Sequence, residues 1–98
     1  MSCLSDNKER AELIAEILKA LAHPLRIRIL AILSEGAHEN VNGLASRLGA
    51  SQPLVSQQLA ILRIHGLLVG VRAGSSVQYK LARPRLKQLV KYLEECPV

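Results

Sequence analysis

The sequence predicts a mainly helical fold with one small β-hairpin. Leucine, isoleucine and valine recur at the three- and four-residue spacing of amphipathic helices in several separate segments. One interval, residues 67–81, instead holds two runs typical of β-strands, LLVGVR and VQYKL, on either side of the turn Ala73-Gly74-Ser75-Ser76. Residues that interrupt or end helices stand between the segments, namely Pro24, Gly36, Gly49, Gly66 and Pro84.

The first two helices are separated by a His-Pro pair. Residues 6–21 carry apolar side chains at helical spacing, and Ser5 or Asp6 is a suitable N-cap. Pro24 disfavours a helical backbone in the residue before it, so this helix ends before His23-Pro24. Pro24 can then open a second helix that ends near Gly36, because proline is favoured in a first helical turn.

Two shorter helices and a hairpin follow. We expect residues 37–41 to form a loop with one short strand, and Asn42 to cap a third helix that Gly49 closes. The fourth helix runs from Ser51 to about His65. The segments 67–72 and 77–81 flank the turn 73–76 as a hairpin, and Pro84 begins a last helix.

Length and composition limit the number of domains and the kinds of protein that this chain can form. A chain of 98 residues is enough for a single domain, residues 1–98, and too short for two. A monomer of this size buries only about 60–65% of its unfolded surface, so a partner subunit would add stability. No apolar run reaches the roughly 20 residues of a membrane span, and the polar, acidic N-terminus is unlike a signal peptide. We therefore expect a cytoplasmic protein without a membrane partner.

The charge is distributed unevenly along the chain. The net charge is +5, and no Asp or Glu occurs between Asn40 and Leu93. That interval holds Arg47, Arg63, Arg72, Lys80, Arg83, Arg85, Lys87 and Lys91. Such a segment predicts a positive surface with a polyanion as partner, and the alternative is a solvated basic face without a ligand.

The fourth helix has two distinct faces. At 100° per residue one side collects Leu54, Val55, Leu59 and Leu62. Gln58 falls on the same side, and we expect it to be a structural residue with a buried partner. The opposite side is short, mostly uncharged and able to form hydrogen bonds. Glutamine can pair bidentately with adenine in a major groove, whereas the alternative is an ordinary exposed helix face. The outer residues are Gln52, Ser56, Ala60 and Arg63, with Gln57 at the margin.

The surroundings of this helix favour DNA recognition. A short helix, a tight turn at residues 48–51 and a polar-faced helix form a helix-turn-helix, whose second helix enters the major groove. The hairpin carries Arg72 on one strand and Gln78 on the other, around a narrow tip suited to phosphate or minor-groove contact. The fold class is thus a winged helix-turn-helix. The predicted partner is double-stranded DNA.

The chain resembles the ArsR/SmtB family of bacterial transcriptional regulators. The resemblance rests on LKALAHPLRIRILAIL (18–33), LASRLGASQPLVSQQLAILRIHGLL (44–68) and VRAGSSVQYKL (71–81), and it covers most of the chain. Family members are homodimers that bind palindromic operators and repress transcription until an inducer, often a metal ion, weakens DNA binding. Many relatives carry His in a VSQHL pattern where this chain has Gln58.

The resemblance implies roles for individual residues. It implies that the first and last helices form the dimer interface, in agreement with the apolar residues Leu13, Ile17, Leu86, Leu89, Val90 and Leu93. The residues that it implies for base reading and for the wing are Gln52, Ser56, Gln57, Arg72, Ser75, Ser76 and Gln78, and Arg63 extends the basic end of the reading helix.

The inducer site departs from the family pattern. Asn40-Val41-Asn42 stands where many relatives have Cys-x-Cys, and amide oxygens are poor ligands for soft metals. The last helix offers Arg and Lys in place of the carboxylate and imidazole ligands of other relatives. His23, His38 and His65 lack ligand spacing. We therefore predict no metal site and no cofactor.

The two cysteines offer another kind of sensor. Cys3 and Cys96 each flank a terminal helix, so oxidation or persulfide formation could link them within or between subunits and weaken DNA binding. Two alternatives remain: unpaired thiols in a reducing cytosol, and a thiolate-metal site with Glu94, Glu95 or a partner subunit.

The predicted function is that of a dimeric, sequence-specific DNA-binding repressor with a palindromic operator and an unidentified inducer. The chain has no phosphate-binding glycine loop, no catalytic carboxylate pair and no nucleophile with a base at motif spacing, so we expect no enzymatic activity. Two alternatives are a winged-helix module that binds proteins without reading DNA and a regulator that acts without a ligand.

Overall fold

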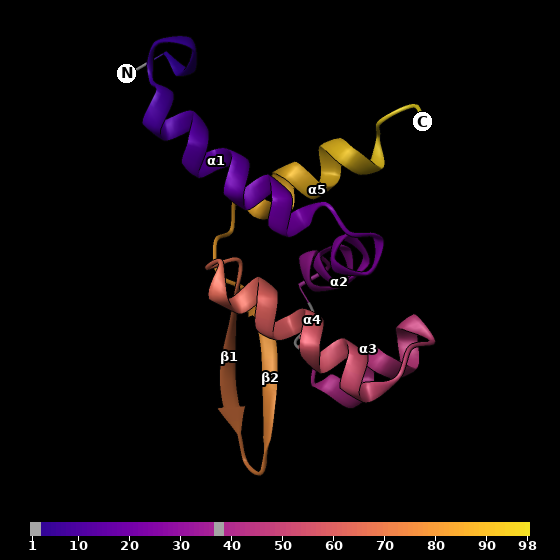
Figure 1. Cartoon of the computed structure of the whole chain (residues 1–98). Coiled ribbons are helices and arrows are strands. Elements are labelled where there is room, and N and C mark those ends of the chain that lie inside the picture. Colours follow the sequence, from indigo (N-terminus) through magenta and orange to yellow (C-terminus); the bar gives the residue numbers. More distant parts are fainter. Residues whose placement is uncertain (1–2, 37–38) are drawn as a thin grey trace.

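The helices and the hairpin occur in the predicted order (Figure 1). The computed structural model describes residues 3–36 and 39–98. A 3₁₀ turn, Leu4–Asp6, comes before the first helix. The elements are α1 (Lys8–Leu21), α2 (Pro24–Ser34), α3 (Val41–Leu48), α4 (Gln52–Ile64), β1 (Leu68–Ala73), β2 (Ser76–Leu81) and α5 (Leu86–Glu94). The prediction of a mainly helical fold with one hairpin is confirmed.

Two predicted helix caps are wrong. Asn7, rather than Ser5 or Asp6, caps α1 by accepting a hydrogen bond from the Arg10 backbone N–H at 3.0 Å. A cap needs a non-helical backbone and a side-chain oxygen within reach of a free N–H in the first turn. Asn40 meets both conditions for α3, with φ of −90°, ψ of 175° and a 2.8 Å bond from the Gly43 N–H. Asn42 therefore lies inside the first turn of α3.

The other helix boundaries agree with the predicted ones to within two residues, and α1 ends at Leu21 and α2 begins at Pro24 as predicted. The imidazole Nδ1 of His23 accepts a hydrogen bond from the Leu25 N–H at 3.2 Å and starts α2. The hydroxyl of Ser51 does the same for α4, accepting from the Leu54 N–H at 3.3 Å. Pro84 precedes α5 by two residues and lies in a turn, so it does not begin that helix as predicted.

Helix α2 is at the centre of the packing. It contacts the other four helices and strand β2. Its Ile29 is fully buried, together with Leu44 of α3, Leu59 and Leu62 of α4 and Leu68 of β1. The core is thus aliphatic, as the composition requires, and it joins the helix-turn-helix to the hairpin.

The hairpin is attached to the helical body at its base. Strands β1 and β2 pair antiparallel, with Leu68 opposite Leu81 and Ala73 opposite Ser76. The sequence predicts a loop with one short strand in residues 37–41. Residues 37 and 38 lie outside the described part of the chain. Glu39 forms an isolated antiparallel bridge with Tyr79 of β2. This bridge connects the hairpin to the segment that leads into α3.

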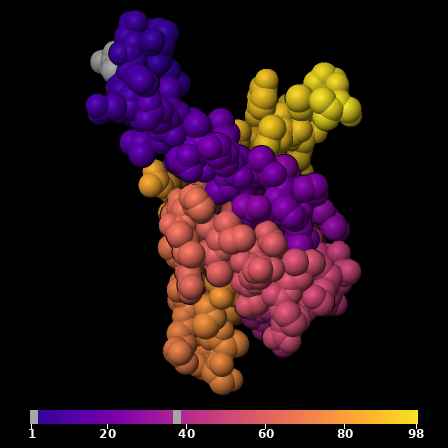
Figure 2. Space-filling model, in the orientation of Figure 1, coloured from indigo at the N-terminus to yellow at the C-terminus, as the bar shows by residue number. Residues whose placement is uncertain are grey.

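The molecule has two distinct ends (Figure 1). The hairpin, α3 and α4 occupy one end, while the start of α1 and the C-terminal part of α5 extend at the other. Figure 2 shows the hairpin and the start of α1 as separate projections from the body. The radius of gyration is 14.5 Å, against about 13 Å for a compact domain of this length. Among residues 3–36 and 39–98, no helix has the length and apolar character needed to cross a bilayer.

Candidate nucleic-acid interface

The turn between α3 and α4 has the geometry of a helix-turn-helix. Helix α3 ends at Leu48, and Gly49 follows with φ of 64°, a left-handed conformation that glycine adopts without strain. The Ala50 N–H donates to the Ala45 carbonyl at 3.1 Å, and Ser51 then caps α4. Only three residues therefore separate the two helices.

Helix α4 presents the predicted polar residues to solvent. Val55, Leu59 and Leu62 are buried, and Gln58 is buried beside them with 7% of its surface exposed. The side-chain carbonyl oxygen of Gln58 accepts no hydrogen bond from the described residues, so the expected buried partner is not found there. The predicted reading residues Gln52, Ser56, Gln57 and Arg63 are all exposed.

Leu54 differs from its predicted position on the apolar side of α4. It is 41% exposed, because at 100° per residue it lies at the margin of the buried face formed by Val55, Gln58, Leu59 and Leu62. Leu54 thus adds an apolar contact surface close to Gln57 and Gln58 in sequence. Apolar side chains of this kind can contact a thymine methyl group in a major groove.

The two faces of the hairpin have different environments. Residues paired directly across an antiparallel ladder point to the same side, and successive residues alternate between sides. Arg72 is opposite Val77 and shares its face with Tyr79, which packs against the core. Gln78 is opposite Val71, on the other face. The predicted wing residues Arg72 and Gln78 therefore project from opposite faces of the hairpin.

The hairpin tip is a two-residue turn. Gly74 has φ of 64° at the first turn position, which matches the hairpin class that requires a glycine there. Ser75 is exposed, and the Ser76 hydroxyl donates to the Ala73 carbonyl at 3.2 Å. The tip is consequently narrow, with small side chains that leave Arg72 accessible.

The first residue of α4 and the hairpin line a common cleft. Gln52 and Ser76 border a shallow depression of about 240 Å³ together with Tyr79 and the residues that start α3. Asn42 belongs to this lining, although the sequence analysis did not include it among the DNA-binding residues. The sequence instead predicted Asn42 as the N-cap of α3.

The basic side chains of the acid-free interval divide into two groups. Arg47 forms an exposed ion pair with Glu35, in which one guanidinium nitrogen, Nη2, donates to both carboxylate oxygens at 2.8 and 2.9 Å and links α3 to the end of α2. The others are exposed, namely Arg63, Arg72, Lys80, Arg83, Arg85, Lys87 and Lys91. Arg63 and Arg72 are the members of this exposed group nearest in sequence to the reading helix and the hairpin tip.

The histidines and cysteines do not gather into a metal site. In residues 3–36 and 39–98, no three side chains of His, Cys, Asp or Glu are close enough to hold a metal ion. His23 caps α2, the His65 ring lies 2.9 Å from the Ile61 carbonyl, and His38 falls outside the described residues. Cys3 is exposed and Cys96 is half-buried, and both are free thiols. In Figure 1 the start of α1 and the C-terminal part of α5 point apart, to the left and to the right, at the same end of the molecule.

Comparison with known proteins identifies the family. The sequence model described as "Bacterial regulatory protein, arsR family" matches residues 23–68. A biofilm growth-associated repressor of Xylella fastidiosa is 36% identical over 88 residues, which are 90% of this chain and 76% of the relative. The HTH-type transcriptional repressor SmtB of Mycobacterium tuberculosis is 41% identical over 83 residues, which are 85% of this chain and 61% of the relative.

A solved structure of a bacterial regulator matches the fold over 99% of this chain. The crystal structure of the transcriptional repressor BigR from Xylella fastidiosa has a TM-score of 0.82 and 32% identity, covering 99% of this chain and 100% of that chain. The helix-turn-helix, the hairpin and the flanking terminal helices are therefore shared with a regulator. The resemblance seen in the sequence is confirmed, and the chain belongs to the arsR family of bacterial regulatory proteins.

Proposed function

We propose that this protein is a dimeric, sequence-specific DNA-binding repressor that acts in the cytoplasm. One observation carries the proposal: α4 presents Gln52, Ser56 and Gln57 to solvent, on the helix that follows the helix-turn-helix turn. These side chains can contact base edges in a major groove without steric hindrance, and they can both donate and accept hydrogen bonds. Because the relatives described above are repressors, we expect DNA binding by this protein to lower transcription.

The hairpin supplies contacts that do not depend on sequence. Arg72 lies near the tip of a narrow projection, where a guanidinium can reach phosphates or the minor groove. The exposed basic residues from Arg63 to Lys91 add a long-range attraction for the duplex. Affinity would thus come largely from charge, and discrimination between sequences from α4.

The terminal helices support a homodimer. Of the 14 residues of α1, only Ala20 and Leu21 are buried in the single chain. Leu13 is 68% exposed, and Leu93 of α5 is 43% exposed. Ile17, Leu86 and Leu89 pack at the edge of the core, and Val90 is buried in it. A partner subunit would remove the exposed part of these helices from water.

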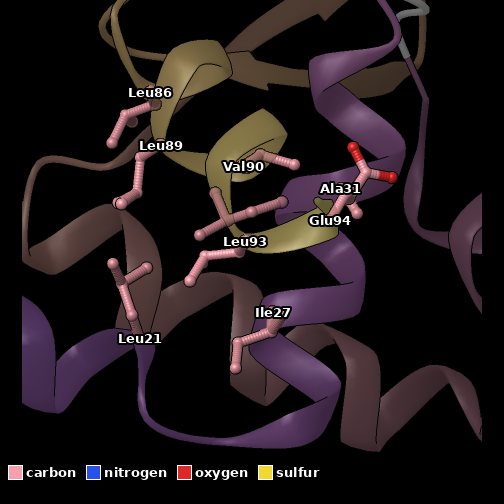
Figure 3. A pocket seen from close by; sticks show the side chains of 9 residues that line it. Leu21, Ile27, Ala31, Leu86, Leu89, Val90, Leu93 and Glu94 are labelled. Carbon is pink, nitrogen blue, oxygen red and sulfur yellow. The ribbon is translucent and has the colours of Figure 1, made fainter. Parts of the chain in front are cut away.

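An apolar cavity lies within the same region (Figure 3). It has a volume of about 130 Å³ between α2 and α5. Leu86, Leu89 and Leu93 of α5 face Leu21 and Ile27 across it, and the Glu94 carboxylate lies at its edge beside Ala31. Aliphatic side chains of a partner subunit would gain favourable transfer free energy by covering such a surface.

Two-fold symmetry would determine the form of the operator. A dimer through α1 and α5 leaves α4 and the hairpin free at the other end of each subunit (Figure 1). Two recognition helices that enter successive major grooves on one side of a duplex are about 34 Å apart. The expected operator is therefore a palindrome with half-sites one helical turn apart.

Selection from a random pool of duplexes tests this function. The bound fraction should be enriched in one palindromic sequence, because the same α4 residues read both half-sites. Enrichment of a single half-site would contradict the dimer, and the absence of any enrichment would contradict sequence-specific reading. Transcription from a promoter that carries the selected sequence should fall when the protein is added.

For the inducer we propose a thiol switch between Cys3 and Cys96. Hydrogen peroxide would oxidise two thiols to one disulfide, with its O–O bond broken and two molecules of water released. The separation of the chain ends in Figure 1 supports a bond between subunits over a bond within one. A changed dimer geometry would then misplace the two recognition helices.

Operator affinity with and without peroxide, in wild type and Cys96→Ser, tests the switch. Peroxide should weaken only the wild type, and equal affinities throughout would leave the cysteines as unpaired thiols without this role. A gain or loss of affinity on addition of zinc that requires Cys96 would instead support the thiolate-metal site with Glu94 or Glu95.

A further inference from the structure

The cleft between the hairpin and the starts of α3 and α4 contains Asn42, a residue without a role in the function described so far. Asn42 of α3, Gln52 of α4 and Ser76 and Tyr79 of β2 line it. We propose that this cleft receives a backbone phosphate of the bound duplex and that Asn42 contacts the DNA there. The proposal rests on the proposed function, because it assumes that α4 and the hairpin engage one duplex.

The position of the cleft follows from the groove geometry of DNA. A recognition helix in the major groove and a hairpin at the adjacent minor groove must lie on either side of a sugar-phosphate backbone, since that backbone separates the two grooves. Gln52 is the first residue of α4, and Ser76 is the first residue of β2. The cleft that both residues line is therefore where the intervening backbone passes.

Hydrogen bonds hold the walls of the cleft in position. The Tyr79 N–H donates to the Glu39 carbonyl at 2.8 Å and connects β2 to the segment before α3. The Asn40 side chain accepts from the Gly43 N–H at 2.8 Å and determines where α3 begins. These two bonds place Asn42 in the first turn of α3, where its side chain is exposed.

The chemistry of the lining suits a phosphate oxygen. Each residue that lines the cleft has a neutral side chain. Asn42 carries an amide NH₂ group with two donors, and amide side chains are common partners of DNA phosphates. The carboxylate of Glu39 packs against Gly43 on α3, and Glu39 does not belong to the lining. A phosphate would therefore meet donors without meeting an anion of the cleft wall.

Two substitutions of Asn42 and one control test the contact. Asn42→Ala removes the donor, and Asn42→Asp places a carboxylate beside the phosphate. A carboxylate in the first turn of a helix is favourable for the helix itself, so Asn42→Asp should keep the melting temperature of the wild type. Gln88→Glu makes the same amide-to-acid change on an exposed residue of α5, on the side of that helix turned away from Leu86, Leu89 and Leu93.

The probes are the duplex selected by the wild type and a duplex of random sequence. Asn42→Ala should weaken both by about tenfold, the value expected for one hydrogen bond to a charged group. Asn42→Asp should weaken both by roughly 30-fold or more, since an anion then faces the phosphate. Gln88→Glu should change either affinity by less than about threefold, because Gln88 lies outside the helix-turn-helix and the hairpin and salt screens its charge.

Replacing single phosphates by neutral methylphosphonates identifies the partner of Asn42. At one linkage in each half-site, the substitution should weaken the wild type but have a much smaller effect on Asn42→Ala, because the two changes remove one interaction. Linkages contacted by other residues, such as Arg72, should weaken both proteins alike. Independent effects at every linkage would overturn the proposal. Weakening of the selected duplex alone by Asn42→Asp would also overturn it, since that result assigns Asn42 to base reading.

The failure of the cleft contact and the failure of the proposed function give different results. A protein that binds random DNA but selects no sequence would contradict sequence-specific repression. The affinities of wild type and Asn42→Asp for the random duplex would still show whether Asn42 contacts a phosphate. Equal affinities of wild type and Asn42→Asp for both duplexes would overturn the proposal for the cleft while leaving the reading residues of α4 in place.

Discussion

Gln57 and Gln58 are neighbours on α4 and lie in opposite environments. Gln57 is exposed, whereas Gln58 retains 7% of its accessible surface and its side-chain carbonyl oxygen has no donor among the described residues. A rotation of 100° per residue separates the two side chains around the helix axis. The same residue type therefore serves two purposes on one helix, and substitution separates them.

Gln57→Ala is expected to weaken the selected operator by about 1–3 kcal/mol, because a base loses a hydrogen-bond partner. Random DNA should be bound almost as tightly as by the wild type. A titration of both duplexes at one salt concentration measures the difference. An equal loss on operator and random DNA would show that Gln57 does not read a base.

Gln58→Leu is expected to raise the free energy of unfolding by about 1–2 kcal/mol, because it removes a buried carbonyl that lacks a donor. The melting temperature should rise by roughly 4–8 °C per kcal/mol at a fixed protein concentration. Gln57→Leu is the matched control at an exposed site and should change stability by less than about 0.5 kcal/mol. A destabilised Gln58→Leu would indicate that the amide has a partner in solution.

Arg72→Ala should weaken operator and random DNA alike, because a phosphate carries no sequence information. The slope of the logarithm of affinity against the logarithm of salt concentration should become shallower by about one unit for each lost phosphate contact. Arg10→Ala removes the same charge from an exposed position on α1, away from the hairpin, and should leave the slope unchanged. An unchanged slope for Arg72→Ala would exclude a direct phosphate contact.

Leu13→Asp is expected to dissociate the dimer, because it places a charge on an apolar surface that the partner would cover. The isolated subunit should keep its fold, since Leu13 is 68% exposed within one chain. Sedimentation should show a shift toward monomer, and operator affinity should fall roughly tenfold or more because one half-site contact is lost. Ala15→Asp adds the same charge to an exposed position turned away from Leu13 on α1 and is the matched control. Equal effects of the two variants would argue against an interface on that face.

The sequence predicted the order of elements, the helix-turn-helix and the exposed face of α4. Each of these depends on local properties: the 3.6-residue period, the breaks at proline and glycine, and the hydrogen-bonding character of a few adjacent side chains. The position of Gln58 on the buried side also followed from the period alone. The absence of a donor for it did not, because its surroundings come from segments that are remote in the chain.

The tertiary structure decided which of two nearby asparagines caps α3 and which remains exposed. The choice depends on the backbone angles of Asn40, and the Glu39–Tyr79 bridge adjoins that residue. It likewise decided that Arg47 is engaged by Glu35 and that Arg72 and Gln78 leave opposite faces of the hairpin. Strand register and ion pairs join residues far apart in the chain, so their geometry is determined only when the core brings those segments together. For the same reason, Asn42, Gln52 and Ser76 border one cleft in space while they are separate in sequence.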